Sequence, residues 1–106
     1  MRPNYKPPFS RFVKKAHKPL QLAIADAAEE ICTNPYIGVA KASDLAEVRV
    51  YTFTFNRQEY LIAYHYGPCT ETAQGTGLEL PVIDFYLIGP HENFYAELKR
   101  YLRSGR

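Results

Sequence analysis

Two adjacent runs of β-branched and aromatic residues constrain the fold of this chain most strongly. Residues 47–55 read EVRVYTFTF, and residues 59–66 read EYLIAYHY. Val, Thr, Tyr and Phe suit a pleated strand, and the polar residues 56–58 between the two runs suit a tight turn. The pair therefore predicts an antiparallel β-hairpin, which needs further elements to cover at least one of its faces.

Helical patterns precede this hairpin. Residues 19–33 place apolar side chains at near-helical spacing, and residues 10–18 predict a shorter helix before them. Residues 1–8 contain three prolines, which remove backbone donors and fix φ, so they are expected to form an extended arm. A chain of 106 residues has room for one compact core, and the predicted single domain covers residues 9–106.

Downstream of the hairpin the pattern changes twice. Residues 67–80 are small, polar and rich in glycine, which indicates a mobile excursion longer than a hairpin needs. Residues 81–88 predict a third strand, and residues 90–102 predict a last helix with apolar side chains four residues apart. The order of elements predicts an α+β fold with two N-terminal helices, a three-stranded antiparallel sheet and a C-terminal helix, the helices covering one face of the sheet.

Alternation along the strands gives each strand two sets of side chains, and one set is expected to pack under the helices. The expected core set is Tyr51, Phe53, Phe55, Tyr60, Ile62, Tyr64, Ile83, Phe85 and Leu87. The open face then carries Thr52, Thr54, His65, Asp84 and Tyr86, with His91 at its edge after Gly89-Pro90. The same alternation places Leu61, Ala63 and Ile88 on this face. Histidines, a carboxylate and tyrosines on one face would suit acid–base chemistry on a phosphodiester. The same pattern also fits the wet face of a partly covered sheet, which is the simpler interpretation for His65 and Asp84.

Charge and cysteine content favour a soluble cytoplasmic protein. The net charge of +2 argues only weakly for a polyanionic partner. Cys32 and Cys69 are isolated in sequence and imply no disulfide framework. No apolar run reaches the length of a signal peptide or a membrane span, so neither a membrane association nor a targeting segment is expected.

Three stretches of the chain, in their order and spacing, resemble the RelE/ParE superfamily of toxins from bacterial type II toxin–antitoxin modules. The resemblance covers residues 9–102. The stretches are Asn34-Pro35 with Gly38 and Leu45, the strand Leu61-Ile62-Ala63-Tyr64, and Gly89 with His91 and Tyr95. The resemblance implies a small toxin that a separate antitoxin neutralises. It also implies one of two targets: mRNA, free or on the ribosome, cut by a cofactor-free and metal-free endoribonuclease, or DNA gyrase, inhibited without catalysis.

The resemblance assigns roles to residues unevenly. It implies that His91 acts as general acid or base and that Tyr95 positions a base or the phosphate, with His65 and Asp84 as further catalytic candidates from the strand pattern. Strand positions that are commonly basic in the nuclease branch carry Thr52, Thr54 and Leu61 instead. Phosphate contacts would then come from Arg57, Lys41, Arg49, Lys14, Lys15 and Lys18. The missing strand cations leave a catalytically degenerate family member as a third alternative.

Overall fold

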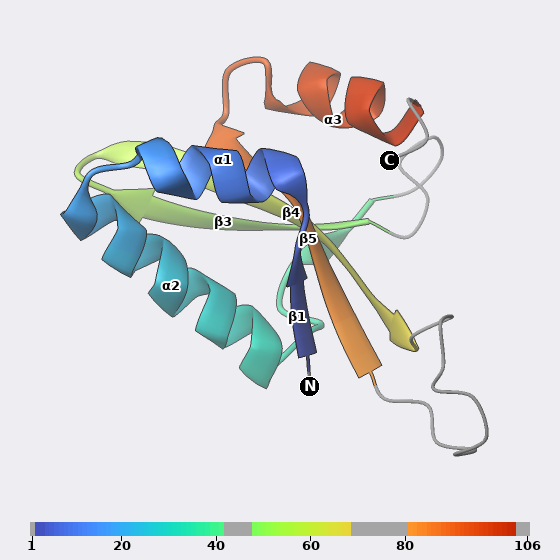
Figure 1. Ribbon diagram of the computed structural model, residues 1–106. Helices are drawn as coiled ribbons and strands as arrows, with labels where there is room; N and C mark the ends of the chain where they lie inside the picture. Colours follow the sequence, from blue (N-terminus) through green and yellow to red (C-terminus); the bar gives the residue numbers. More distant parts are fainter. Residues whose placement is uncertain (1, 42–47, 69–80, 104–106) are drawn as a thin grey trace.

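A computed structural model describes residues 2–41, 48–68 and 81–103 of the chain (Figure 1). In chain order its elements are β1 (Arg2–Tyr5), α1 (Pro7–Lys15), α2 (Lys18–Thr33), β2 (Val39–Ala40), β3 (Arg49–Phe55), β4 (Gln58–Pro68), β5 (Pro81–Pro90) and α3 (Phe94–Arg103). The three helices and the β3–β4 hairpin confirm the predicted mixed fold. Most of the excursion expected over residues 67–80 lies outside the described residues, as does Cys69.

The sheet has five strands in the order β1-β5-β4-β3-β2, so the prediction of three strands was wrong. β1 pairs in parallel with β5, from Arg2 opposite Val82 to Tyr5 opposite Phe85. Proline is tolerated here because β1 forms an edge of the sheet and bonds on one side only. Residues of the expected N-terminal arm therefore belong to the sheet, and Figure 1 shows β1 alongside β5.

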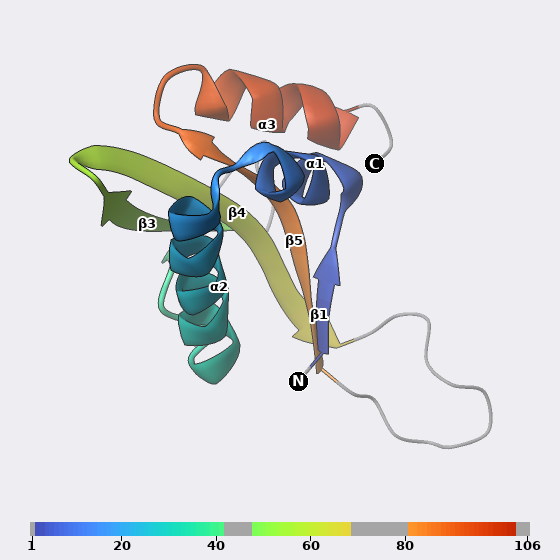
Figure 2. The same cartoon turned by 60° about the vertical axis from the view of Figure 1, so that its left-hand side comes forward.

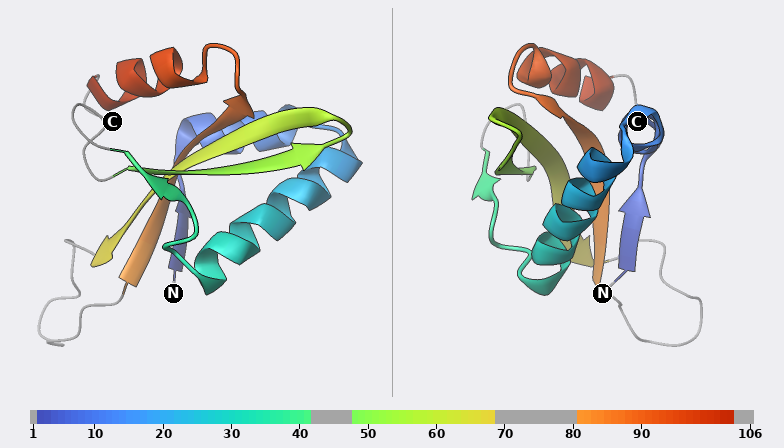
Figure 3. Two further views of the ribbon diagram at one scale, coloured as in Figure 1. Left: turned by 180° about the vertical axis from the view of Figure 1, so that it is seen from behind. Right: turned by 90° about the vertical axis from the view of Figure 1, so that its left-hand side faces the viewer.

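Two smaller differences follow from local chemistry. α1 begins at Pro7 and not at Ser10, because proline suits the first turn of a helix, where no N–H partner is required. β2 has only two residues and pairs antiparallel with β3 through Val39 and Val50, which is too short a strand to leave a pattern in the sequence. Seen from behind, β2 forms the sheet edge beyond β3 (Figure 3).

Helices α1 and α2 pack on one face of the sheet and form a first core with it. Its buried side chains from the strands are Ile62, Tyr64, Ile83, Phe85 and Ile88, and those from the helices include Phe9, Leu20, Ile24 and Ile31. Phe9 and Phe85 also stack with Tyr5 of β1, at centroid distances of 5.4 and 5.1 Å from its ring. The first core therefore ties the N-terminal strand to the centre of the sheet.

The opposite face is not open, which corrects the expectation that all helices cover one face. α3 crosses this face (Figure 2) and forms a second core with it. The buried members of the second core are Val48, Val50, Leu61, Ala63, Leu87, Phe94 and Leu98. Leu61 and Ala63 were assigned to a wet face from alternation alone, but α3 buries both. Thr52 and Thr54 lie on the same side and stay exposed.

A β-bulge explains the remaining error in the predicted core. The β4–β5 register shifts between Ala63 and Tyr64, so that Ala63 faces Leu87 while Tyr64 faces Phe85. One extra residue in β5 reverses the alternation beyond that point. Leu87 therefore joins the second core and Ile88 joins the first, the reverse of the predicted assignment.

Candidate functional site

The turn between β5 and α3 places His91 at the surface. β5 ends at Pro90, and Phe94 opens α3 by donating its backbone N–H to the carbonyl of His91 at 3.2 Å. Asn93 makes this sharp turn with φ of 63°, a left-handed conformation that asparagine tolerates better than most residues. The His91 side chain is exposed beside the first turn of α3.

Three chemically active side chains meet at this turn, and we call them the Tyr95 cluster: His91, Tyr95 and Lys41. The His91 ring meets the Tyr95 ring edge-on, with centroids 6.0 Å apart and an interplanar angle of 76°. The Lys41 ammonium lies over the Tyr95 ring, 5.4 Å from its centroid, a cation–π contact. An imidazole, a phenol and an ammonium thus share one half-exposed site, although Lys41 lies far from the other two in the sequence.

Lys41 is positioned by a loop that the buried phenol of Tyr64 holds in place. The Tyr64 hydroxyl donates to the carbonyl of Pro35 at 2.6 Å and accepts the N–H of Gly38 at 2.9 Å. Burial raises the pKa of Tyr64, although the Gly38 hydrogen bond and the nearby Arg49 cation lower it in part. The phenol therefore stays protonated and keeps donating. β2 follows Gly38 directly, and the N–H of Lys41 then bonds to the carbonyl of Val48 at 2.9 Å.

The Arg49 side chain binds the same loop. Its guanidinium donates to the carbonyls of Gly38 at 2.8 Å and Tyr36 at 3.4 Å, and it lies over the Tyr36 ring at 5.0 Å. Arg49, which was expected to contact phosphate, therefore has a structural role in the loop. The strand pattern predicted that Tyr64 lies in the core, but not that its hydroxyl binds this loop. The spacing of Asn34-Pro35 and Gly38 before a strand was the feature of the sequence that indicated the loop.

The other expected cations are dispersed. Lys14 and Lys15 lie on α1 and Lys18 opens α2, so all three belong to the helices that cover the opposite face of the sheet. Arg57 is exposed in the β3–β4 turn, beyond the pair that Tyr60 makes with Pro90. Among these four, Arg57 alone belongs to the β3–β4 hairpin of the sheet, although the ring contacts of His17 with Phe55 and of Phe12 with Tyr60 bring the α1–α2 connection close to the same turn.

His65 and Asp84 form a second polar group near the other end of β4 and β5. They are cross-strand partners, and Asp84 also accepts a hydrogen bond of 2.8 Å from the amide of Asn4. The Leu61–Gly89 pair, next to the turn that carries His91, is four residues away along β4, or about 13 Å at the rise of a strand. The four expected catalytic residues therefore divide into two separate pairs.

No cluster of three or more possible metal ligands occurs within residues 2–41, 48–68 and 81–103. None of the helices that the structure describes is long and apolar enough to cross a membrane. Cys32, on α2, is a free and half-buried thiol.

A comparison with models of protein families identifies the family to which this chain belongs. The family model described as ParE-like toxin of type II bacterial toxin–antitoxin system matches residues 4–99. The chain belongs to this family, and the family implies a cognate antitoxin as its partner. Searches among curated proteins and solved structures returned no match.

Proposed function

We propose that this toxin cleaves mRNA and that the Tyr95 cluster is its catalytic centre. The observation that supports the proposal is the meeting of His91, Tyr95 and Lys41 at an accessible turn. Proton transfer by a positioned imidazole and stabilisation of developing charge by a cation are the two contributions that RNA cleavage without a metal requires.

In the proposed reaction the 2′-hydroxyl of the substrate attacks the adjacent phosphorus. His91 takes the proton of this hydroxyl as the new P–O bond forms, and returns it to the 5′-oxygen as the old P–O bond breaks. The products are a 2′,3′-cyclic phosphate and a 5′-hydroxyl end. Tyr95 positions the phosphate or a base beside the imidazole, and Lys41 offsets the charge of the pentacoordinate intermediate.

Arg57 is proposed to bind the RNA backbone near this centre, because it is exposed on the sheet's own turn beyond the Tyr60–Pro90 pair. Lys14, Lys15 and Lys18 lie on the helices of the other face, close to the α1–α2 connection that contacts the hairpin through His17 and Phe55, and are proposed as more peripheral RNA contacts. His65 and Asp84 are proposed as a separate polar site on the same substrate path.

The first test is cleavage of a purified transcript in the presence of a metal chelator. His91→Ala is expected to slow cleavage by about a hundred-fold or more, the usual contribution of a general acid or base. Glu92→Ala is the matched control, since Glu92 is the next exposed residue in the same turn. Equal cleavage by the His91→Ala protein and the parent would exclude the mechanism.

A second candidate, inhibition of DNA gyrase, is favoured by the ParE-like description of the family and by the side chains on β3 and β4. Thr52 and Thr54 are uncharged and Leu61 is buried under α3, so those three positions supply no cation to a phosphate. This alternative predicts intact transcripts together with loss of supercoiling by purified gyrase. A chain with neither activity would be a degenerate toxin.

A further inference from the structure

The loop between α2 and β2 carries the most exposed large apolar side chain of the residues that the structure describes. Tyr36 has 64% of its surface exposed, and Ile37 and Val39 beside it are exposed as well. Single apolar side chains at a surface need no explanation, but a group of three on one short segment indicates a binding surface. We call Tyr36, together with the Arg49 side chain that lies over its ring, the Tyr36 platform.

The loop holds Tyr36 in a fixed position. The side-chain oxygen of Asn34 accepts the N–H of Tyr36 at 3.3 Å, and its backbone carbonyl accepts the N–H of Ile37 at 3.0 Å. The Arg49 guanidinium donates to the carbonyl of Tyr36 and lies 5.0 Å from the centre of its ring. The Tyr66 ring meets the Tyr36 ring at 5.3 Å and 82°. An aromatic ring that is both exposed and fixed binds a flat ligand without the entropy cost of ordering the side chain.

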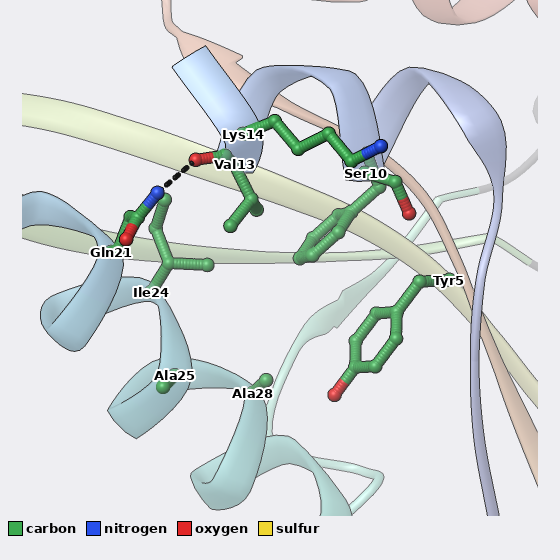
Figure 4. A pocket seen from close by; sticks show the side chains of 9 residues that line it. Tyr5, Ser10, Val13, Lys14, Gln21, Ile24, Ala25 and Ala28 are labelled. Carbon is green, nitrogen blue, oxygen red and sulfur yellow. Dashed lines mark hydrogen bonds between the residues drawn. The ribbon is translucent and has the colours of Figure 1, made fainter. Parts of the chain in front are cut away.

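Tyr5 is also exposed, but the packing of the first core explains its position. Its ring stacks on Phe9 and Phe85, and it lines a pocket of about 300 Å³ between α1 and α2 (Figure 4). Tyr36 differs, because neither core includes it among the buried or partly buried side chains of the described residues. The position of the Tyr36 ring is therefore set by the loop and by a cation, and not by core packing.

Positive charge accompanies both the Tyr36 platform and the Tyr95 cluster. Arg49 supplies it at the platform, and Lys41 supplies it over Tyr95. Five residues of chain join Tyr36 to Lys41, so their Cα atoms are no more than about 18 Å apart. The acids of α2 line a separate surface, formed by Asp26, Glu29, Glu30 and Thr33. A ligand that reaches both sites needs a flat unsaturated ring and negative charge along its length, and single-stranded RNA has both.

We propose that the Tyr36 platform binds a nucleobase of single-stranded RNA, a few nucleotides from the bond that the Tyr95 cluster cuts. The base stacks on the exposed side of the Tyr36 ring, and Arg49 attracts the phosphate backbone beside it. The choice of RNA as the ligand rests on the proposed function. Binding at Tyr36 is nevertheless measured without cleavage, so the two proposals are tested separately.

The first test measures the affinity for a labelled 2′-O-methyl RNA of about eight nucleotides, which has no free 2′-hydroxyl to attack the phosphorus, by fluorescence anisotropy. Tyr36→Leu keeps an apolar side chain but removes the aromatic ring, and it is expected to weaken binding by about ten-fold, the usual contribution of one stacked base. Tyr36→Phe keeps the ring and is expected to bind like the parent. Equal affinities of the leucine and phenylalanine variants would overturn the proposal.

Leu22→Ala is the matched control for the loss of an exposed apolar side chain. Leu22 is 57% exposed on α2, and its removal is expected to leave the RNA affinity nearly unchanged. Equal weakening by Leu22→Ala and Tyr36→Leu would show that the loss is not specific to the platform, and would also overturn the proposal.

The second test observes stacking directly. The chain contains no tryptophan, so Tyr36→Trp introduces a single indole fluorophore at the platform. Its emission is expected to fall as the RNA binds, because the base stacks on the indole. Leu22→Trp places the same fluorophore at an exposed position of α2 and is expected to keep its emission. Unchanged emission of the Tyr36→Trp protein at saturating RNA would contradict stacking.

The outcomes separate this proposal from the proposed function. Parent affinity and normal cleavage in the Tyr36→Leu protein would exclude the platform and leave the catalytic centre in place. Weakened binding by Tyr36→Leu and quenching in Tyr36→Trp, with no cleavage by the parent, would support the platform and exclude the nuclease. A parent protein that binds no RNA would exclude the platform.

Discussion

At the scale of single residues, Tyr64 links the first core to the candidate site. Its ring is fully buried beneath α1 and α2, and its hydroxyl holds the loop that leads to Lys41. Gly38 completes this arrangement, because a Cβ at this position would lie 2.7 Å from the Tyr64 hydroxyl oxygen. The loop can approach the phenol only where residue 38 has no side chain.

Tyr64→Phe is expected to lower the free energy of unfolding by about 1–3 kcal/mol, because a buried N–H and a buried C=O lose their partner. Urea denaturation checks this value. Tyr66→Phe is the matched control, since it keeps the ring contact with Tyr36, and it is expected to stay within about 0.5 kcal/mol of the parent. Equal losses of unfolding free energy in the two variants would show that the hydrogen bonds of the Tyr64 hydroxyl do not stabilise the fold.

The raised pKa of Tyr64 also predicts a dependence on pH. The folded protein retains this proton more strongly than the unfolded chain, whose phenol titrates near 10.0. The stabilisation is therefore complete below pH 10.0 and is lost as the pH rises through the higher folded value. The difference in stability between the parent and Tyr64→Phe should narrow above pH 10.0 in paired denaturation curves. A difference in stability that stays constant above pH 10.0 would contradict a raised pKa of Tyr64 in the folded protein.

At the scale of elements, the β3–β4 hairpin carries backbone strain at its tip. Asn56 and Arg57 have φ of 53° and 67°, the two left-handed residues of a tight hairpin turn. Asparagine suits the first of these positions, whereas the second usually takes glycine. An arginine here costs stability, which fits a surface role such as the RNA contact proposed above.

Arg57→Gly is expected to raise the free energy of unfolding by about 1 kcal/mol, by relieving the left-handed strain, and to slow RNA cleavage. Arg57→Ala separates the two effects, because it removes the charge but keeps the Cβ. The alanine variant should cleave RNA as slowly as the glycine variant without the gain in stability. Full cleavage by both variants would remove Arg57 from the proposed site.

Helix α3 is the element that closes the second core. Leu98 is fully buried in it, so Leu98→Ala is expected to cost about 2–5 kcal/mol in the free energy of unfolding. Leu102→Ala makes the same change one turn later, where the side chain is only partly buried, and should cost clearly less. Equal costs in urea denaturation would contradict the packing of α3 on the sheet.

At the scale of the whole molecule, the sheet separates two cores, one under α1 and α2 and one under α3. The Tyr95 cluster lies at the start of α3, on the face opposite α1 and α2. Changes at the exposed turn that carries His91 are therefore expected to leave the packing of the first core unchanged.

Much of the fold could be predicted from local patterns. The hairpin, the long α2 helix and the last helix follow from alternation and helical spacing, which depend on neighbouring residues alone. The spacing of Gly89, His91 and Tyr95 also identified the turn that carries the candidate site. The short strands could not be predicted this way, since β2 has two residues and β1 contains a proline.

By itself, the sequence determined the three helices, the hairpin and the strand before α3, and that His91 and Tyr95 lie close together where that strand passes into α3. Only the tertiary structure decided which faces are covered, because a β-bulge exchanges Leu87 and Ile88 and α3 buries Leu61. It also brought Lys41 over Tyr95 and kept His65 and Asp84 away from His91. Strand register and helix packing depend on contacts between residues distant in sequence, and local patterns do not contain them.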